Sequence, residues 1–198
     1  MSKIIPSRPE ALRGFWEEAR SAMSLPAEPA GAFAFGDSRE LADELAELVV
    51  NGPKRATAGL MVGFEHDAQP VPKPGQHWIV LDGRGSPVCI IRTVEVRIGP
   101  LSSVDATFAW DEGEGDRTLA SWKQAHERYF RRRCAVLGVP FSPDLETAFE
   151  RFDRVWPDSD FGLVLQAEFR EDRTDNDECR RSTWTPRDDD QHDRLDKS

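Results

Sequence analysis

Three side chains that could do chemistry follow the end of a predicted helix in the stretch NGPKRATAGL, residues 51–60. Lys54 and Arg55 bring two cations, and Thr57 a hydroxyl, to the point where a strand is expected to begin. If the strand begins at once, alternation sends Arg55 and Thr57 to one face and Lys54 to the other. Either the cations are solvated charges beside an ordinary strand threonine, as exposed charges usually are, or they clamp a phosphate or carbonyl group.

A second candidate site is the acidic stretch WDEGEGDRTLASWKQAH. Four carboxylates within six residues are interleaved with glycines that allow a tight path: Asp111, Glu112, Glu114 and Asp116. Like charges this close raise one another's pKa, as suits a general acid or base, and carboxylate oxygens also bind Mg²⁺ or Mn²⁺. The structural alternative is that Asp116 is the N-cap of a helix that begins at Arg117, where acids are stabilised by the helix dipole.

Aromatic and imidazole side chains could complete a binding site. Trp122 and His126 are four residues apart on a predicted helix and therefore share one face. Together with Trp78 and Trp110, Trp122 could stack a base, as the aromatic residues of single-strand binders do. The structural alternatives are the commoner ones, because most tryptophans pack in a core and a lone histidine on an apolar stripe is more often a core residue than a metal ligand.

The composition bounds the class of protein. The 198 residues suit one domain with additional elements. Their formal net charge of −10 argues against binding of duplex DNA, because an acidic protein repels phosphate. No run of about 18 apolar residues could span a membrane, the N-terminus lacks the long apolar stretch of a secretory signal, and three scattered cysteines fit reduced thiols. These features predict a cytoplasmic protein without a membrane partner.

Apolar residues at helical spacing predict three helices, over residues 7–23, 37–52 and 116–138, and a shorter one over 100–113. The second helix is expected to begin with Asp37 and Glu40 in capping-box spacing and to end at Gly52 in the left-handed conformation. The shorter helix is expected to begin at Ser102 or Ser103.

Stretches rich in Val, Ile, Leu, Phe and Thr predict strands over residues 54–64, 76–83, 86–99 and 161–171. The Pro-, Gly- and Ala-rich residues 25–36 are expected to be an irregular connection. Helices at both ends of a run of short strands favour an α+β fold whose sheet closes into a small β-barrel flanked by helices. At the C-terminus, ten Asp/Glu, six Lys/Arg and few aliphatic residues predict that residues 171–198 are disordered.

Three stretches, in this order, resemble the longer bacterial branch of the ASCH domain family, the ASC-1 homology group: NGPKRATAGL, VPKPGQHWIVLDGRGSPVCIIRTVEV and AWDEGEGDRTLASWKQAHERYF. The resemblance runs from about Leu41 to Phe169 and includes a G-x-K-x-x-T string that begins at Gly52. It implies a PUA-like β-barrel with a helix-bordered cleft for RNA or a nucleoside.

Together with the composition and the helix pattern, the resemblance divides the chain into three parts. Residues 1–37 would form an N-terminal helix and connection, residues 38–170 the ASCH domain, and residues 171–198 an acidic tail.

The resemblance also implies two enzymatic activities. Some bacterial members of the family are divalent-metal-assisted ribonucleases on single-stranded RNA. Smaller relatives are amidohydrolases that remove the acetyl group of N4-acetylcytidine, and in them a Lys-x-x-Thr string and a later Glu carry the reaction. By motif, Lys54 and Thr57 match the first two residues, while Glu112 and Glu114 both compete for the third and Glu114 is favoured.

We therefore expect an RNA-directed hydrolase, with the ribonuclease reading first. In that reading Lys54 stabilises charge on the phosphate while Glu114 or Glu112 removes a proton, directly or through metal-bound water. The predicted ligands for Mn²⁺ or Mg²⁺ are Glu112, Glu114 and Asp116.

Two alternatives use many of the same residues. In an amidohydrolase that removes acyl groups from modified cytidine, Thr57 attacks or positions water and Glu114 shuttles the proton. A non-catalytic RNA-binding module would hold single-stranded RNA or a modified nucleoside by stacking and by a cationic clamp. The residues predicted to contact such a ligand are Arg55, Trp78, Trp110, Trp122 and His126.

Overall fold

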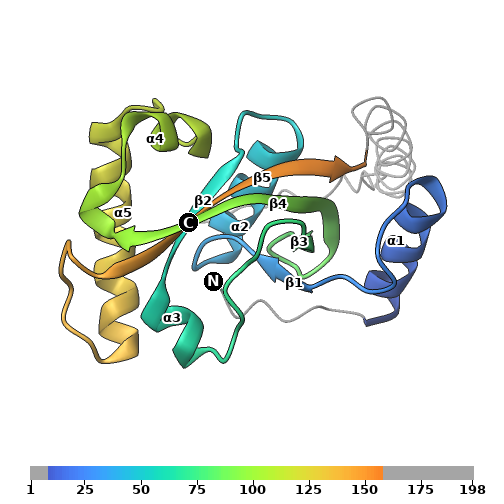
Figure 1. Cartoon of the computed structure of the whole chain (residues 1–198), viewed down its shortest axis with the longest axis horizontal. Helices are drawn as coiled ribbons and strands as arrows, with labels where there is room; N and C mark the ends of the chain where they lie inside the picture. Colours follow the sequence, from blue (N-terminus) through green and yellow to red (C-terminus); the bar gives the residue numbers. More distant parts are fainter. Residues whose placement is uncertain (1–8, 158–198) are drawn as a thin grey trace, which may run out of the picture. The chain divides into compact units, whose positions relative to one another are not determined.

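The computed structural model describes residues 9–157 (Figure 1). The helices are α1 (Pro9–Ala22), α2 (Arg39–Val50), α3 (Met61–His66), α4 (Ala106–Glu112) and α5 (Leu119–Leu137), with a 3-10 turn η1 (Leu101–Ser103) before α4. The strands are β1 (Gly31–Ala34), β2 (Ala56–Leu60), β3 (His77–Leu81), β4 (Pro87–Pro100) and β5 (Glu146–Trp156). None of the helices in this range is both long and apolar enough to cross a membrane.

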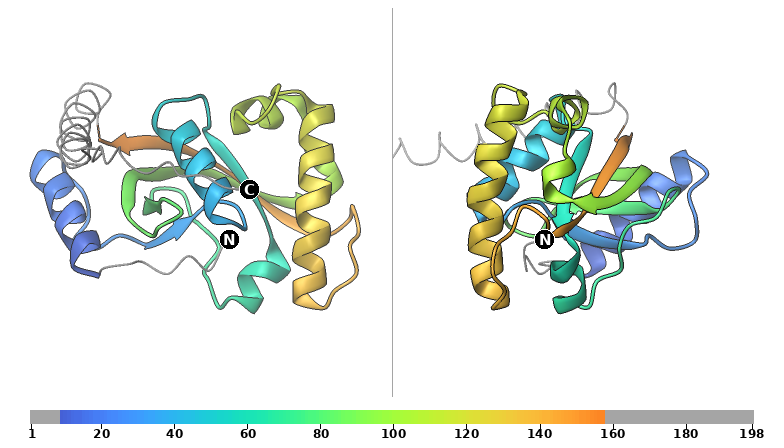
Figure 2. Two further views of the ribbon diagram at one scale, coloured as in Figure 1. Left: turned by 180° about the vertical axis from the view of Figure 1, so that it is seen from behind. Right: turned by 60° about the vertical axis from the view of Figure 1, so that its left-hand side comes forward.

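The strands form one curled five-stranded sheet in the order β1-β3-β4-β5-β2. β1 pairs in parallel with β3, and the other neighbours are antiparallel. The register of β4 and β5 shifts between Thr93 and Glu95, an irregularity that bends a long strand. Figure 2 shows the curl as an open half-barrel with β1 and β2 at its two edges. The predicted α+β fold, a small barrel-like sheet flanked by helices, is confirmed in this open form.

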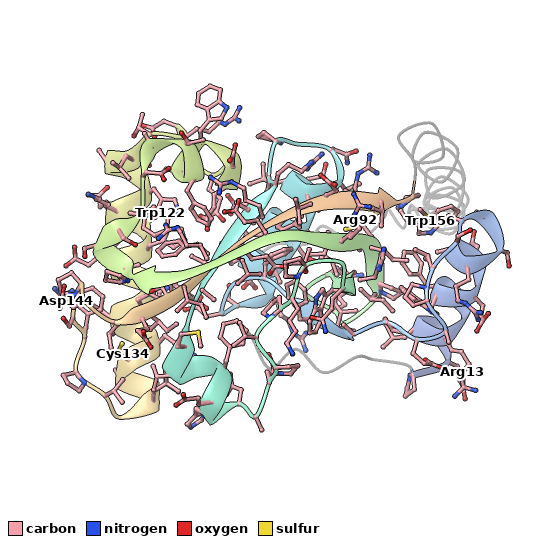
Figure 3. All side chains as sticks on the ribbon, viewed as in Figure 1. Arg13, Arg92, Trp122, Cys134, Asp144 and Trp156 are labelled. Carbon is pink, nitrogen blue, oxygen red and sulfur yellow. The ribbon has the colours of Figure 1, made fainter. Side chains whose placement is uncertain are left out.

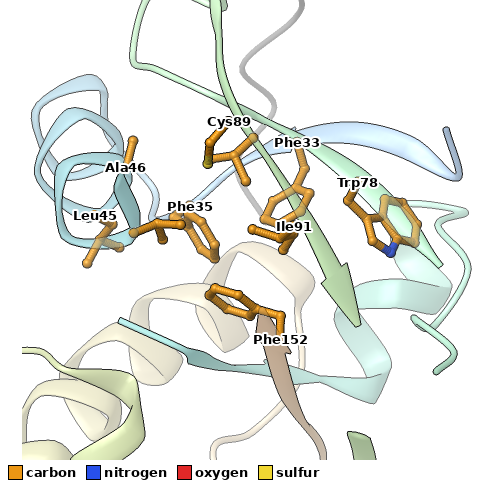
Figure 4. Close-up of a cluster of buried hydrophobic side chains, with 10 residues drawn as sticks. Phe33, Phe35, Leu45, Ala46, Trp78, Cys89, Ile91 and Phe152 are labelled. Atoms are coloured by element: carbon orange, nitrogen blue, oxygen red, sulfur yellow. The ribbon is translucent and has the colours of Figure 1, made fainter. Parts of the chain in front are cut away.

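Three apolar clusters hold the helices on the sheet. The first packs α2 against side chains such as Phe33 and Phe152 (Figure 4). The second packs α4 and α5 against β2 and against Phe149 of β5. The third places Trp16 of α1 with Trp156, which lies at the end of β5 (Figure 3). The sheet therefore has apolar cover from helices on more than one side.

The start of α2 differs from the prediction. Its N-cap is Ser38, whose side chain accepts a hydrogen bond from the backbone N–H of Leu41. Asp37 is not the cap; its carboxylate pairs instead with Arg132 of α5 at 2.8 Å. A serine next to the aspartate can take the cap because both residue types do so equally well.

The end of α2 also differs. Asn51 is the C-cap with φ of −113°, and Gly52 is not left-handed as predicted. A glycine suits this position for another reason, since a Cβ atom there would lie only 3.0 Å from the carbonyl oxygen of Leu48. Close approach to the helix, and not backbone handedness, favours glycine at this position.

The caps of α4 and α5 are shifted along the chain from the predicted residues. Asp105 caps α4 by accepting from the N–H of Phe108, because the predicted Ser102 and Ser103 belong to the preceding 3-10 turn. Thr118 caps α5, two residues after the predicted aspartate.

The strand predictions are wrong in three places. Residues 54–64 divide into β2 and α3, because β5 pairs only with Ala56–Leu60. β1 lies inside residues 25–36, which were predicted to be irregular. β5 was not predicted at all, because four consecutive buried residues followed by partly exposed charged ones give no clear polar alternation. The predicted strand over 161–171 and the predicted tail over 171–198 lie outside the described residues.

Candidate active site

The structure brings Lys54 and Glu114 into direct contact. They are 60 positions apart in the chain, and the Nζ atom of Lys54 donates to Oε1 of Glu114 at 2.5 Å. The Lys54 side chain is 1% exposed and that of Glu114 28% exposed. The start of β2 and the loop after α4 therefore meet, with the ammonium buried and the carboxylate partly open.

Backbone contacts explain why these two segments meet. The N–H of Arg55 donates to the carbonyl of Asp111 at 2.7 Å, and the N–H of Lys54 donates to the carbonyl of Leu48 at 3.1 Å. Gly113 ends α4 with φ of 68°, and a Cβ atom there would lie 2.7 Å from the backbone nitrogen of Lys54. A glycine is required here both by the left-handed backbone and by the close approach.

Glu112 is buried completely and bonds inside the protein. Its Oε2 atom accepts from the indole N–H of Trp122 at 2.7 Å and lies 3.0 Å from Nε2 of His126. The other ring nitrogen of His126 lies 3.1 Å from the carbonyl oxygen of Trp122. Since both ring nitrogens face acceptors, the imidazolium form satisfies both contacts.

Lys54, His126, Glu112 and Glu114 form a charge-balanced cluster of two basic and two acidic groups. Burial lowers the pKa of Lys54, but the charges of Glu114 and Glu112 raise it more, and the pKa lies above its ordinary value. Burial lowers the pKa of His126 as well, and the Glu112 carboxylate more than compensates. The pKa of Glu112 is raised by burial and lowered more strongly by His126 and Lys54. These shifts favour Lys54 as an ammonium and not as a general base.

A pocket of about 230 Å³ lies beside the charged cluster. Thr57, Glu114 and His126 all form part of its wall, so these three residues border one space. Residues of both edge strands, β1 and β2, also line it, which places the pocket at the gap of the half-barrel. Four aromatic side chains complete much of the wall: Phe33, Phe35, Phe64 and Tyr129.

The helices on either side of the gap contribute to the same pocket. Leu41 and Leu45 of α2 and Tyr129 of α5 line it, and in Figure 2 (left) α2 and α5 lie on opposite sides of β2. Lys54 itself is not part of the wall. It touches the wall through Glu114 and through the ring of Phe35, whose centroid lies 5.3 Å from Nζ.

Arg55 does not join Lys54 at the pocket. Its guanidinium donates to the backbone carbonyl of Val49 at 3.1 Å and to that of Lys54 at 2.6 Å. Because β2 begins only at Ala56, Arg55 precedes the strand and turns back onto the end of α2. The two cations therefore do not form a common clamp.

The three tryptophans form no common stacking surface. Trp78 and Trp122 are buried in separate apolar clusters. Trp110 is 55% exposed, and the guanidinium of Arg117 covers its ring at 3.7 Å. The stacking partners that the pocket does offer are its phenylalanine and tyrosine rings, which the sequence did not single out.

The predicted metal ligands Glu112, Glu114 and Asp116 do not converge. Glu112 is taken up inside the charged cluster and Glu114 by Lys54, while Oδ1 of Asp116 accepts from the N–H and the hydroxyl of Thr118 at 2.9 and 2.8 Å. Within residues 9–157 no three His, Cys, Asp or Glu side chains are grouped so that they could hold a metal ion. The residues present do not fit Mg²⁺ or Mn²⁺.

Glu150 is a pocket residue that the sequence did not reveal. It lines the pocket, is 3% exposed, and pairs in register with Thr57 across β5 and β2. Its Oε1 atom accepts from the hydroxyl of Thr93 at 2.7 Å. The signal that could have pointed to it depends on β5, since an acid within a run of four buried residues of a strand is an exception to be explained.

Comparisons with known proteins agree with this architecture. A sequence model described as the ASCH domain matches residues 31–156. The crystal structure of an ASCH domain from Lactobacillus crispatus JV V101 is similar, with a TM-score of 0.66 and 30% identity over 76% of this chain and 98% of that chain. A protein from Enterococcus faecalis V583 gives a TM-score of 0.68 and 33% identity over 75% of this chain and 90% of that chain. Comparison with curated proteins gave no match.

The matched range covers every strand of the half-barrel and the whole charged cluster, whereas α1 precedes it. The chain therefore belongs to the ASCH domain family, whose PUA-like fold is associated with RNA binding.

Proposed function

We propose that the protein is a hydrolase that removes the acyl group from the exocyclic amine of an N4-acylcytidine-type nucleoside. The observation that carries this proposal is that the Glu114 carboxylate, held at 2.5 Å by the buried Lys54, lines the same pocket as the Thr57 hydroxyl. These residues match the Lys-x-x-Thr string and later Glu of the small amidohydrolases of the family. The aromatic wall and limited volume of the pocket suit one flat ring.

In the proposed reaction Glu114 removes a proton from a water molecule that the Thr57 hydroxyl positions, and the water oxygen attacks the acyl carbon. Lys54 favours the tetrahedral oxyanion through its positive field and keeps Glu114 oriented as a carboxylate. The bond from carbon to nitrogen then breaks as Glu114 passes the proton to the leaving amine. The products are the free carboxylic acid and the unmodified cytidine.

Acetate release tests the proposal directly. The full chain is incubated with N4-acetylcytidine in the presence of EDTA, and acetate and cytidine are measured by chromatography. Glu114→Gln is expected to lower kcat/KM by at least about 100-fold, because it removes the proton acceptor. Glu146→Gln, an exposed acid on β5, is the matched control and is expected to stay near the parent value.

Two outcomes would overturn this function. One is no acetate release by the parent protein at high enzyme concentration. The other is a rate that Thr57→Ala leaves unchanged, because the hydroxyl would then have no part in the reaction.

Cleavage of single-stranded RNA is a second candidate, and the observation that favours it is cationic. Arg128 and Arg132 line the pocket on α5, and guanidinium groups are well suited to bind phosphate. Glu114 would then deprotonate a ribose hydroxyl, and the Lys54 field would act on the phosphate.

Labelled single-stranded RNA distinguishes this candidate from the first. Cutting that is lost in both Glu114→Gln and Lys54→Ala would support it, and parallel reactions with Mn²⁺, Mg²⁺ or EDTA would show whether metal assistance exists. Saturable RNA binding without cutting or acetate release would instead identify a non-catalytic RNA-binding module.

A further inference from the structure

The pocket contains a second carboxyl group that the proposed reaction does not use. Glu150 of β5 pairs in register with Thr57 of β2 and lines the pocket beside it. Residues paired across an antiparallel sheet have Cβ atoms about 5 Å apart. A ligand whose reacting group is held at Thr57 therefore has part of its ring edge within reach of Glu150.

Glu150 differs from the acids of the charged cluster in having no cationic partner. Within residues 9–157 no Lys, Arg or His side chain forms an ion pair with it, and its Oε1 atom accepts a hydrogen bond from the Thr93 hydroxyl. Burial raises the pKa of Glu150 to about 7, against a smaller opposing effect of the Thr93 hydrogen bond. The charged groups that share the pocket with it are Glu114, His126, Arg128 and Arg132.

A neutral carboxyl group offers one O–H donor and one carbonyl acceptor side by side. That pair complements a ring edge on which a ring nitrogen acceptor lies next to an N–H donor, as in the N3 and N4 positions of cytosine and of its N4-acyl derivatives. Because Thr93 already donates to Oε1, the Oε2 side of the group is left to donate to the ring nitrogen. The phenylalanine and tyrosine rings of the wall would hold the faces of the same base.

We propose that Glu150 is the specificity-determining residue of the pocket and selects aminopyrimidines by hydrogen bonding to the N3 and N4 edge. This inference rests on the proposed function for the orientation of the ligand, but it concerns recognition and not the chemical step. It names the substrate class as cytosine-type nucleosides and excludes acylated amines that lack an adjacent ring acceptor.

Binding of the reaction product separates recognition from catalysis. Cytidine and 3-deazacytidine, in which the N3 acceptor is replaced by C–H, are titrated calorimetrically into the full chain. The parent protein is expected to bind cytidine at least about tenfold more tightly, because the analogue leaves a buried donor unpaired. Glu150→Gln, which retains a donor and an acceptor, is expected to keep this preference, and Glu150→Leu is expected to lose it.

The outcomes are distinguishable. Three results would overturn the inference. The parent protein could bind the two nucleosides equally, or it could fail to bind cytidine. A Glu150→Leu protein that unfolds at the parent midpoint could also keep the same preference. If the preference depends on Glu150 but acetate release fails, recognition stands and the proposed hydrolase function does not. If Glu150→Leu does not fold, the parent and the Glu150→Gln protein still test the inference. The carboxamide of glutamine keeps one donor and one acceptor, so loss of the preference in Glu150→Gln would contradict recognition by such a pair.

Discussion

Glu150 and Glu112 are both buried acids on the same site, yet their environments shift their pKa values in opposite directions. Burial raises the pKa of Glu112, but the positive charges of His126 and Lys54 lower it more. Among residues 9–157 no cation pairs with Glu150, and burial raises the pKa of its carboxyl group to about 7 although the Thr93 hydroxyl bonds to it. The partner, and not burial alone, decides which acid is charged.

The pKa of Glu150 predicts how stability changes with pH. Its folded value of about 7 lies above the ordinary value of 4.5, so the folded state favours the protonated acid. The penalty for ionising it is absent below pH 4.5, grows as pH rises to about 7, and then stays constant at about 3 kcal/mol or less. Glu150→Gln is therefore expected to raise the free energy of unfolding above pH 7 and to leave it nearly unchanged at about pH 4.

Urea unfolding of the parent protein and the variant at both pH values measures this difference. Glu146→Gln on the same strand is the exposed control. An equal stabilisation at both pH values would contradict a raised pKa of Glu150.

The charged cluster predicts a large cost for removing one charge. Glu112→Gln leaves Lys54 and His126 with a single acid between them in a buried setting, and is expected to destabilise the fold by about 3–5 kcal/mol. Glu127→Gln, on the exposed side of α5 with a side chain 51% exposed, is expected to cost under about 1 kcal/mol. Chemical denaturation measures both, and similar values for the two would contradict the buried cluster.

At the residue scale, the sequence predicted those candidate site residues that belong to a short sequence motif. Lys54 and Thr57 share one string and Glu114 belongs to the other, so their residue types could be read directly. Glu150 could not be found this way, because its place in the pocket depends on pairing with a strand more than ninety positions away. The same holds for Arg55, whose direction is set by the end of α2.

At the scale of elements, the junction between α4 and β2 depends on one backbone position. Gly113 and Gly138 both end helices in the left-handed conformation, with φ of 68° and 71°. A Cβ atom at Gly113 would meet the backbone of Lys54, whereas one at Gly138 would meet nothing within 4 Å. Alanine variants at the two glycines therefore share the cost of the left-handed backbone and differ in the close approach to Lys54.

Gly138→Ala is expected to cost about 1–2 kcal/mol of stability for the backbone alone. Gly113→Ala is expected to cost about 1–3 kcal/mol more, and to lower acetate release as well because it displaces Glu114 from Lys54. Thermal unfolding and the activity assay on both variants test this. Equal losses would show that the close approach to Lys54 does not matter.

The elements also show what periodicity can and cannot predict. The stripe on α5 was predicted because its buried residues recur at helical spacing. β5 was missed because four consecutive residues, 147–150, are buried and give no alternation. A strand such as β5, with a neighbour on each side in the sheet, is recognisable from those neighbours in space, and β2 is not its neighbour in sequence.

At the scale of the described chain, we expect α1 to stabilise the fold without helping to form the pocket. α1 precedes the matched ASCH range, none of its residues lines the pocket, and its Trp16 is 2% exposed in an apolar cluster with the sheet. Trp16→Ala is expected to lower the free energy of unfolding by about 3–5 kcal/mol. Acetate release per folded molecule, measured well below the unfolding midpoint, is expected to stay at the parent rate.

The exposed Trp110 provides the control, since Trp110→Ala removes a ring that is 55% exposed and is expected to cost under about 1 kcal/mol. A loss of activity in Trp16→Ala that exceeds the unfolded fraction would show that α1 also shapes the pocket.

The general architecture was predictable from the order of helices and strands, but the open gap between β1 and β2 was not, because β1 itself is only four residues long.

The balance of two basic and two acidic groups in the charged cluster also restricts which substitutions this site can accept during evolution. A single neutral replacement at a buried member of the cluster, such as Glu112, leaves one charge uncompensated, so such a step passes through a destabilised intermediate. Substitutions that remove a cation and an anion together, such as Lys54→Met with Glu114→Leu, avoid that barrier and would leave a folded protein whose pocket lacks the proposed proton acceptor. We expect the four positions to behave as an epistatic unit, in which double variants are more stable than the sum of their single variants predicts.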